Sequence, residues 1–430
     1  MKLLNPQSNL PKCRFCGTAL KNTFVDLGMQ PLCESYLNSD QLNHMEPFYP
    51  LHVYICDNCF LVQLEEYVAP EEIFSEYAYF SSYSDTWLRH AKNYTDMIVS
   101  KFGFDEKSQV VELGSNDGYL LQYFKQKGIP VLGVEPAANI AKVAISKDIP
   151  TLIQFFNPNV ANDLVGENKQ ADLVIGNNVL AQVPDLNGFV EGMRILLKPL
   201  GVITIEFPHL LKLIEGNQFD TIYHEHFSYF SFLIVEKVFA AHGLRIFDVE
   251  ELPTHGGSLR IYACHSENAA MLTATRVGDL RSREIREGFM TLEKYLLFSD
   301  KVKETKRNLL DLLINLKRNG SSIVGYGAPG KGNTLLNYCG IRSDFLDYTV
   351  DRNPYKQGKF LPGSHLPIYP PDKIKETKPD FIIILPWNIK YEIIEQVSFI
   401  SAWGGKFIIP IPEVKVYDTH HIEEYNGIKK

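Results

Sequence analysis

The 430-residue sequence lacks any apolar stretch that approaches the roughly 20 residues needed to span a bilayer. It also lacks an excess of basic residues: 43 Lys and Arg stand against 51 Asp and Glu, and the net charge of −8 argues against a general nucleic-acid binder. The first residues, up to Cys13, contain no signal-peptide core. We therefore expect a cytoplasmic protein with no membrane partner and no nucleic-acid partner.

Cysteine is scarce, with seven residues in the whole chain, but four of the seven form two CxxC pairs. These four are Cys13, Cys16, Cys56 and Cys59. A tetrahedral zinc ion takes four thiolates at about 2.3 Å, and each CxxC turn can supply two of them. A pair of disulfides or of redox CxxC motifs is the alternative. The spacing favours a structural zinc site, with strands formed by the apolar residues around 24–27 and 51–55 joining its two turns.

The composition, 45% hydrophobic and 22% charged, is typical of a globular protein. A chain of this length exceeds one ordinary hydrophobic core, so we expect three domains. They are a zinc-binding module with an aromatic segment (1–84), an α/β domain with linker helices (85–318) and a second α/β domain (319–430).

Short apolar runs alternate with amphipathic helical patterns after residue 85, which predicts βαβ units and a mostly parallel sheet. The expected strands are QVVEL, PVLGVE, PTLIQF, ADLVIG and GVITIEF, and LRIFDVEE and SLRIYAC could add antiparallel strands. Charge-rich helical spacing over 279–318 predicts one or two long connecting helices. A second parallel set follows in SSIVGYG, DYTVD, FIIILP and KFIIPI. The sequence thus predicts an α/β protein with two nucleotide-fold-like halves behind a zinc module.

A glycine-rich loop, ELGSNDG, ends the first expected strand of the first α/β half. Glycines let the backbone approach a ligand, and the start of the following helix offers free N–H groups. A dinucleotide site would carry GxGxxG, but Asn116 replaces the second glycine and the acid Asp117 would repel a phosphate. The loop therefore suits a cationic, phosphate-free cofactor better.

This ExGxxxG form resembles the first motif of S-adenosylmethionine-dependent methyltransferases. The resemblance places Glu135, about 20 residues further on, against the ribose hydroxyls. It places Phe155 and Phe156 beside the adenine, and Asn177 and Asn178 facing the methionine part. The alternative is a helix cap with surface acids. The expected cofactor-binding residues are Glu112, Gly114, Asn116, Asp117, Gly118, Glu135, Phe155, Asn177 and Asn178.

The segment 223–229, YHEHFSY, is dense in titratable side chains. Histidine titrates near neutrality, and a neighbouring carboxylate can hold one tautomer and raise its basicity, so the pattern suits proton abstraction. Metal binding by His224 and His226 is one alternative, although the sequence supplies no obvious third ligand. Capping and packing by an aromatic patch is the other.

Seven motifs follow one another along nearly the whole chain: the paired CxxC, an aromatic segment, ELGSNDG, NNVLAQVPD, YHEHFSYFS, THGGSLR and GYGAPGKGN. This order resembles that of the sugar C-methyltransferases that act on nucleotide-linked 4-keto-deoxy sugars. The resemblance implies a zinc domain, a class I (Rossmann-like) domain that binds S-adenosylmethionine and a C-terminal Rossmann-like domain that holds the sugar nucleotide. It also implies methylation at C-3 of the hexose, and it leaves dTDP, GDP and CDP open as the nucleotide.

The resemblance further assigns roles to single residues. His226 is expected to be the base that removes the proton beside the ketone and so generates an enolate. Glu225 is expected to orient or assist it, and Tyr223 to hydrogen-bond the substrate. Tyr77 and Tyr79, in the aromatic segment, are expected to approach the sugar or the methyl donor.

One residue departs from the family pattern, which reads AHVPD where this chain has AQVPD. Gln182 can hydrogen-bond a substrate but cannot exchange a proton at neutral pH. This departure puts the identity of the substrate and the details of the mechanism in doubt. We count Gln182 and His224 among the expected substrate-binding residues.

The second glycine-rich loop, residues 325–333, also joins an expected strand to a helix, and it carries a cation. Lys331 and the free N–H groups of the helix start can balance a pyrophosphate. Pro329 departs from the dinucleotide fingerprint, and a tight turn without a ligand is the alternative. Lys356 lies near Asp351 in the sequence, where the next expected strand ends. The expected substrate-binding residues here are Gly325, Gly327, Lys331, Asn333 and Asp351.

Two other functions stay open at this point. One is S-adenosylmethionine-dependent O-methylation of a sugar or small molecule, and the other is a non-catalytic, zinc-containing nucleotide-binding protein. We expect a monomer or a weak homo-oligomer.

Overall fold

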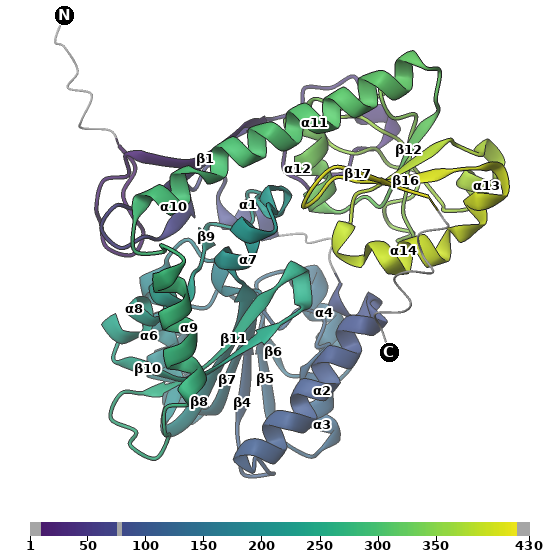
Figure 1. Ribbon diagram of the computed structural model, residues 1–430. Helices are drawn as coiled ribbons and strands as arrows, with labels where there is room; N and C mark the ends of the chain where they lie inside the picture. The colour runs from purple at the N-terminus through teal and green to yellow at the C-terminus, as the bar shows by residue number, and fades with distance from the viewer. Residues whose placement is uncertain (1–9, 75–79, 419–430) are drawn as a thin grey trace, which may run out of the picture. The chain divides into compact units, whose positions relative to one another are not determined.

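The computed structural model in Figure 1 describes residues 10–74 and 80–418. The chain divides into two compact units. Unit 1 contains Met1–Asn22, Tyr54–Leu211 and Glu225–Lys294, and unit 2 contains Thr23–Val53, Lys212–His224 and Tyr295–Lys430. Residues between the two CxxC pairs are thus grouped with the C-terminal sheet, whereas the pairs themselves belong to unit 1. The domain boundaries expected at residues 84 and 318 stay a prediction.

Unit 1 is built on a seven-stranded sheet with the order β10-β11-β8-β7-β4-β5-β6. Its strands are β4 (Val110–Leu113), β5 (Val131–Val134), β6 (Thr151–Leu152), β7 (Ala171–Asn177), β8 (Leu197–Pro208), β10 (Leu244–Leu252) and β11 (Ser258–His265). Strands β4 to β8 are parallel, and the β10–β11 hairpin adds two antiparallel strands beside β8. The expected mixed sheet is therefore confirmed. The expected strand PTLIQF is paired over only two residues, and Ile153 and Phe155, which follow them, are solvent-exposed.

Helices cover both faces of this sheet and complete a three-layer α/β unit (Figure 1). One face packs against α5 (Pro158–Gly166), α6 (Leu186–Leu196) and α8 (Phe232–Ala241). The other packs against α2 (Asp85–Phe102), α3 (Leu121–Gln126) and α4 (Ala138–Ser146). The strands are buried on both sides, which is why they read as continuous apolar runs rather than as alternating ones.

A small sheet of order β1-β2-β3-β9 contains the strands near the cysteine pairs. Its strands are β1 (Asn22–Gln30), β2 (Tyr49–Ile55), β3 (Val62–Leu64) and β9 (Ser228–Tyr229). Within unit 1, β3 pairs antiparallel with β9, so Val62 lies opposite Tyr229. This pairing connects the second CxxC turn to the YHEHFSY segment.

Unit 2 contains a six-stranded sheet of order β14-β13-β12-β15-β16-β17, parallel except for β17. Its strands are β12 (Ile323–Tyr326), β13 (Thr349–Val350), β14 (Ile368–Tyr369), β15 (Phe381–Ile384), β16 (Lys406–Ile409) and β17 (Lys415–Tyr417). The four expected strands are confirmed, and the short β14 and β17 were not foreseen. Helices α11 (Phe298–Arg318), α12 (Gly330–Cys339), α13 (Lys373–Thr377) and α14 (Lys390–Gln396) belong to the same unit.

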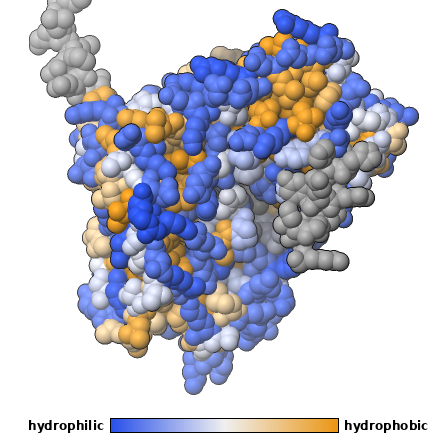
Figure 2. Space-filling model, viewed as in Figure 1, coloured by the Kyte–Doolittle hydropathy of each residue, from blue (hydrophilic) through white to orange (hydrophobic). Residues whose placement is uncertain are grey.

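The remaining helices are α1 (Pro70–Phe74), α7 (Leu210–Glu215), α9 (Thr275–Arg286) and α10 (Leu292–Leu296). On the face drawn in Figure 2, hydrophilic residues predominate and apolar residues form separate patches. Within the described ranges, every helix is too short or too polar to cross a lipid bilayer.

One buried carboxylate in unit 1 connects three elements. Glu284, on α9, is completely buried, and its oxygens accept hydrogen bonds from Phe232 N at 2.7 Å and Leu233 N at 2.9 Å, at the start of α8. His209, which follows β8, places Nε2 2.6 Å from Glu284 Oε1. The first N–H groups of a helix have no partner inside the helix, and an anion is favoured there. Glu284 therefore fixes α9 to α8 and to the end of β8.

We expect Glu284→Ala to lower the free energy of unfolding by about 3–5 kcal/mol, because it leaves two helix-start N–H groups and a buried imidazole without their acceptor. Urea unfolding followed by circular dichroism measures this. Glu287→Ala is the matched control: this exposed carboxylate lies one helical turn away and 3.2 Å from Lys294 Nζ. Equal losses in the two variants would contradict the role given to Glu284.

Candidate functional site

The strand order of unit 1 reverses between β4 and β7, because the chain runs from β4 outward to β5 and β6 and then returns to β7 and β8. In open α/β sheets a crevice forms outside the carboxyl ends of the strands at such a reversal. The loop after β4 begins at Gly114, and Asn177 and Asn178 lie at the end of β7. The two motifs expected to bind the cofactor therefore meet at the same edge of the sheet.

The loop after β4 depends on glycine at two positions. Gly114 and Gly118 have φ values of +66° and +76°, which are unfavourable for residues with a side chain. A Cβ at Gly114 would lie 3.1 Å from Val179 Cγ2, and one at Gly118 would lie 2.4 Å from Ile149 Cδ1. Larger residues would thus both strain the loop and push the neighbouring chain away.

Three buried acids surround this loop. Glu112, on β4, is completely buried, and burial together with repulsion from Glu135 and Asp117 raises the pKa of its carboxyl group well above the usual value. Burial also raises the pKa of Glu135. Lys147 Nζ lies 3.6 Å from Asp117 Oδ2. This acidic lining fits a cationic cofactor such as S-adenosylmethionine and disfavours a pyrophosphate.

Glu135 also shapes the loop itself. Its Oε2 accepts a hydrogen bond from Asn116 N and its Oε1 one from Ala137 N, both at 2.9 Å. The carboxylate is therefore held at the carboxyl end of β5, the position expected for a ribose-binding acid. The ribose contact itself stays a prediction.

The end of the aromatic segment contacts the same loop. Ser81 N donates a hydrogen bond to Asn116 Oδ1 at 2.9 Å, and Ser82 N donates one to Asp117 Oδ2 at 3.3 Å. The chain that leads into α2 is thereby attached to the cofactor loop. Tyr77 and Tyr79 lie outside the described residues, and their expected contacts stay predictions.

The two phenylalanines after β6 differ in their surroundings. Phe156 packs edge-on against Phe189 of α6, with ring centroids 5.5 Å apart. Phe155 is 37% exposed. Phe155 is therefore the one whose ring is accessible to a ligand such as adenine.

A buried charge network at the end of β8 was not foreseen from the sequence. Glu206 is completely buried, and its carboxylate lies 2.9 Å from His90 Nε2, 2.8 Å from Arg260 Nη2 and 2.8 Å from Thr254 Oγ1. Burial opposes ionisation, but the His90 hydrogen bond and the Arg260 charge hold the pKa of Glu206 below its usual value. The motif THGGSLR, which contains Thr254 and Arg260, was the available signal.

Asn178 connects β7 to this network. Its backbone has φ +57°, its N donates a hydrogen bond to Glu206 O at 2.7 Å, and its Nδ2 lies 3.2 Å from His255 Nε2. Asn177 Nδ2 donates to Tyr119 OH at 3.4 Å. The two asparagines thus point to different neighbours at the site edge.

The YHEH segment passes from unit 2 to unit 1 between His224 and Glu225. In unit 1, Glu225 and His226 are buried, and Phe227 N donates to Ala181 O at 2.7 Å. Because Ala181 precedes Gln182, this bond attaches the expected base to the loop after β7. The structure therefore brings His226 and Gln182 to the same carboxyl edge as the cofactor loop.

In unit 2, His224 is engaged in packing. Its Nε2 lies 3.2 Å from Pro50 O, its ring meets Tyr49 edge-on, and burial lowers its pKa. In the described part of the chain, the only group of His, Cys, Asp and Glu with the geometry of a metal site is the four cysteines. The metal interpretation of His224 and His226 is thus not supported there.

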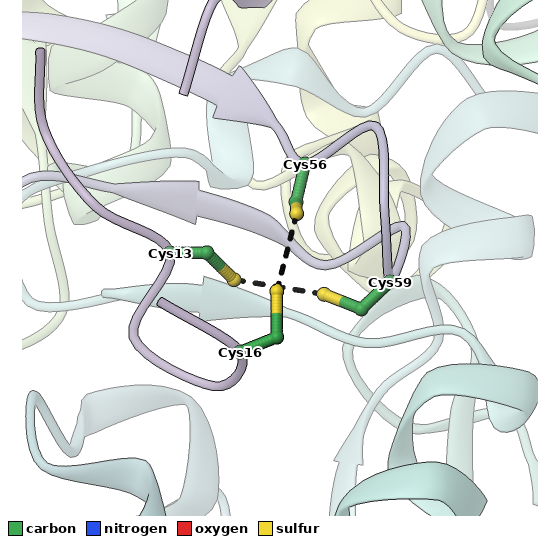
Figure 3. Close-up of side chains that lie close together, drawn as sticks. All are labelled: Cys13, Cys16, Cys56 and Cys59. Atoms are coloured by element: carbon green, nitrogen blue, oxygen red, sulfur yellow. Dashed lines mark hydrogen bonds between the residues drawn. The ribbon is translucent and has the colours of Figure 1, made fainter. Parts of the chain in front are cut away.

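The four cysteines form a candidate zinc site in unit 1. Figure 3 shows Cys13, Cys16, Cys56 and Cys59 pointing toward one centre from two turns. All four are free thiols, their sulfurs lie within 4.8 Å of one another, and Sγ–Sγ distances of 3.5 Å join Cys13 to Cys59 and Cys16 to Cys56. A tetrahedral zinc with bonds of about 2.3 Å separates its sulfurs by about 3.8 Å, so the residues fit the ion.

Arg14, inside the first CxxC turn, connects this site to the rest of unit 1. Its guanidinium donates hydrogen bonds to Leu64 O and, at 2.9 Å, to Pro184 O, and it lies over the Phe227 ring at 5.5 Å. Phe227 O accepts a hydrogen bond from Leu64 N at 3.0 Å. The zinc turn thereby contacts both chain segments that carry Gln182 and His226.

The second glycine-rich loop lies at the carboxyl end of β12 in unit 2. Gly327 has φ +91°, and a Cβ at Gly325 would lie 2.7 Å from Thr349 Oγ1. Ala328 N donates to Asp351 Oδ2 at 2.7 Å, so this expected substrate-binding acid already hydrogen-bonds the loop. Lys356 Nζ donates to Ala328 O at 2.9 Å.

Lys331 follows this loop at the start of α12. Its Nζ donates to Asn388 Oδ1 at 2.8 Å and lies over the Trp387 ring at 5.1 Å. Burial lowers the pKa of Lys331, and burial raises the pKa of Asp220, which accepts a hydrogen bond from Trp387 Nε1, to about 7. Asn333 is buried with its Nδ2 unpaired among the described residues. A cation and an unpaired donor fit an anionic ligand.

Three family models match the chain. They describe a zinc binding domain over residues 13–74, a methyltransferase domain over 87–249 and a C-methyltransferase C-terminal domain over 253–412. The C-methyltransferase NovU of Streptomyces niveus is 34% identical over 407 residues, which cover 95% of this chain and 97% of NovU.

Two more distant similarities cover less than half of the chain. The ubiquinone biosynthesis O-methyltransferase of Rhodopseudomonas palustris (strain TIE-1) is 27% identical over 118 residues, 26% of this chain and 46% of that protein. The crystal structure of the PH0226 protein from Pyrococcus horikoshii OT3 has a TM-score of 0.37 and 16% identity, covering 47% of this chain and 99% of that one. The similarity to NovU, in contrast, spans nearly the whole chain.

We expect the purified protein to contain about one zinc ion per chain, measured by inductively coupled plasma mass spectrometry, and Cys56→Ser to lose it, because three thiolates leave the coordination shell open. Cys264→Ser is the matched control, since this buried thiol lies on β11 and is not part of the cysteine cluster. Full zinc retention in Cys56→Ser would contradict the assignment.

Proposed function

Because this chain belongs to the family of S-adenosylmethionine-dependent C-methyltransferases, we propose that it methylates C-3 of a nucleotide-linked 4-keto-deoxy hexose. The observation that carries the proposal is the hydrogen bond from Phe227 N to Ala181 O. It attaches the buried Glu225–His226 pair to the loop after β7, at the edge where the cofactor loop also lies. A histidine beside a carboxylate at this edge is suited to removing a proton from carbon.

The proposed chemistry follows from the acidity of a C–H bond beside a ketone. His226 takes the C-3 proton, and Glu225 orients the imidazole and favours its protonated form. Tyr223 hydrogen-bonds the sugar, and Gln182 does so without exchanging a proton. S-adenosylmethionine supplies, when bound, a methyl group on a sulfonium that the C-3 carbanion attacks.

The residues proposed to hold this cofactor are those of the acidic loop and its neighbours. Gly114 and Gly118 keep the loop open for the backbone of Asn116 to approach a ligand, Asn177 and Asn178 are proposed to face the methionine part, and Glu135 the ribose. Phe155 is proposed to flank the adenine, since its ring is accessible. Asp117 adds negative charge that attracts the cation, and Glu112, whose raised pKa favours the protonated form, lines the loop beside it.

The nucleotide part of the substrate is proposed to bind unit 2. Lys331 and the start of α12 supply positive charge for a diphosphate, and the unpaired Asn333 Nδ2 supplies a further donor. Asp351 and Lys356 hold the loop in place, because each forms a hydrogen bond with the backbone of Ala328. The chemistry of this loop is the same for dTDP, GDP and CDP, so it does not select among them.

We expect the zinc-containing full-length protein to convert dTDP-4-keto-6-deoxyglucose or GDP-4-keto-6-deoxymannose, with S-adenosylmethionine, to a product heavier by one methyl group. Mass spectrometry detects the product. In deuterium oxide without cofactor, proton NMR is expected to show loss of the C-3 signal, because deprotonation precedes methyl transfer. Absence of a methylated product with both sugars, or a methyl group on oxygen, would contradict the proposal.

We expect His226→Ala to slow both C-3 exchange and methyl transfer by about 100-fold or more, in the range of general-base contributions. Calorimetric affinity for S-adenosylmethionine is expected to stay within about twofold, since the cofactor loop is untouched. His242→Ala is the control: this half-buried histidine pairs with Asn187 and Glu191 and lies outside the proposed site. Normal exchange in His226→Ala would reject this residue as the base.

A further inference from the structure

Unit 2 contains a buried carboxylate close to the residues proposed to bind the diphosphate. Asp220, in the 3₁₀ turn η5 (Phe219–Thr221), is completely buried. Its Oδ2 accepts a hydrogen bond from Trp387 Nε1 at 2.7 Å, and its Oδ1 is buried without a hydrogen-bond partner among the described residues. Burial of an ionised carboxylate with an unsatisfied oxygen costs free energy. The environment of Asp220 therefore opposes its negative charge.

The indole of Trp387 connects Asp220 to Lys331. Lys331 Nζ lies over the Trp387 ring, 5.1 Å from its centroid, while Nε1 of the same indole donates to Asp220. The hydrogen-bond acceptor of Lys331 Nζ is Asn388 Oδ1, at 2.8 Å, which is neutral. Burial lowers the pKa of Lys331, and the charge of Asp220 opposes that shift. The cation proposed to meet the diphosphate is therefore balanced by Asp220.

Helix α12, which carries Lys331, packs against the turn that carries Asp220. Thr334, one turn into the helix, donates its hydroxyl to Ile222 O at 3.0 Å. Ile222 directly precedes Tyr223, the residue proposed to hydrogen-bond the sugar. The start of α12 is thus attached to a short chain segment that has Asp220 at one end and Tyr223 at the other.

Opposing effects determine how readily Asp220 ionises. Burial raises the pKa of its carboxyl group to about 7, although the charge of Lys331, the Trp387 hydrogen bond and the backbone N–H groups of Asp220 and Thr221 act to lower it. Asp220 is therefore about half ionised at neutral pH, and Lys331 is the cation that favours its charged form.

The other titratable groups of the neighbouring helices are neutral or act at one remove. Cys339, on α12, interacts electrostatically with Asp220, but burial raises the pKa of its thiol to about 12. Tyr338, whose ring meets Phe219 edge-on, also has a pKa raised by burial. Lys306, on α11, lies over the Tyr338 ring and acts on Cys339. Lys331 thus remains the charged partner of Asp220.

A diphosphate bound at Lys331 would change this balance. A second anion near a carboxyl group raises the pKa of that group, because two like charges repel. The pKa of Asp220 without ligand, about 7, is then the lower of the two values. Binding therefore takes up a proton at neutral pH, and the affinity is highest below pH 7 and falls as the pH rises through that value.

We propose that Asp220 is a positioning residue that acts as the exchangeable counter-charge of Lys331, so that binding of the nucleotide diphosphate at Lys331 is accompanied by protonation of Asp220. This inference rests on the proposed function, in which Lys331 and the start of α12 bind the diphosphate. The proton comes from solvent, and only the O–H bond of the carboxyl group forms. The affinity for the nucleotide sugar thereby depends on pH through a buried residue.

Isothermal titration calorimetry of the zinc-containing full-length protein with dTDP-glucose or GDP-mannose tests this. Both lack the reactive ketone, and neither diphosphate has a group that titrates near neutral pH. Heats measured at pH 7 in two buffers of different ionisation enthalpy are expected to show uptake of about 0.3–0.5 proton per bound nucleotide, because Asp220 is about half ionised before binding. We expect the affinity to be about three- to tenfold higher near pH 6 than near pH 8.

Asp220→Asn removes the charge but keeps an oxygen that can accept from Trp387 Nε1. We expect this variant to bind without proton uptake and, near pH 8, about three- to tenfold more tightly than the wild type, a gain that the loss of a merely structural contact would not give. Asp380→Asn is the matched control. Asp380 accepts from Ser322 N at 2.8 Å beside the amino ends of β12 and β15, and this variant is expected to keep wild-type proton uptake.

The outcomes separate the inference from the proposed function. Wild-type binding without proton uptake would overturn the inference and leave the proposed function intact, and so would undiminished uptake in Asp220→Asn. If neither nucleotide sugar binds to the wild type, the placement of the diphosphate at Lys331 fails and the inference with it.

Discussion

The position of the proposed base depends on the guanidinium of Arg14. Arg14 lies between the two cysteines of the first turn in the sequence. Its guanidinium donates hydrogen bonds to Leu64 O and Pro184 O and packs over the Phe227 ring. Burial lowers its pKa to about 10, so it stays charged at neutral pH. Because Pro184 lies two residues after Gln182 and Phe227 follows His226, one cation holds the same two loops that the hydrogen bond from Phe227 N to Ala181 O joins. The zinc site has no place in the proposed chemistry, but it holds the backbone from which Arg14 extends.

The carboxyl edge of the unit 1 sheet separates two electrostatic environments. On the β4 and β5 side, burial raises the pKa values of Glu112 and Glu135, which lie close to Asp117, and a bound cationic cofactor would favour the ionised forms of these acids. On the β8 side, the buried charge of Glu206 is met by Arg260, and His90 and Thr254 complete its hydrogen bonds. The charge of Glu206 on that side is therefore balanced by Arg260 and does not compete for the cationic cofactor. Asn178, which bonds to both Glu206 and His255, marks the border between them.

The sequence predicted the elements that periodicity and local chemistry determine. The parallel strands, both glycine-rich loops and the cysteine cluster follow from runs of apolar residues, from glycine positions and from CxxC spacing, all of which are local. Glu206 was not foreseen because it lies inside the strand GVITIEF, where a single acid reads as an interruption of an apolar run. The contact between His255 and Asn178 was not foreseen, because it depends on the left-handed backbone of His255, which the sequence THGG permits but does not require. The grouping of residues 23–53 with unit 2 was not foreseen either, since the flanking cysteines suggested one continuous module.

The HEH sequence shows why motif density alone does not assign roles. Alternate residues of an extended chain point the same way, so His224 and His226 look equivalent as letters. In the structure the boundary between the units falls directly after His224, whose ring is held by Tyr49 and Pro50, whereas His226 belongs with the loop after β7. Burial lowers the pKa of His224, which keeps it neutral as a packing residue. The same tripeptide thus places a structural histidine and a candidate base two residues apart, and the backbone partners on either side decide which is which.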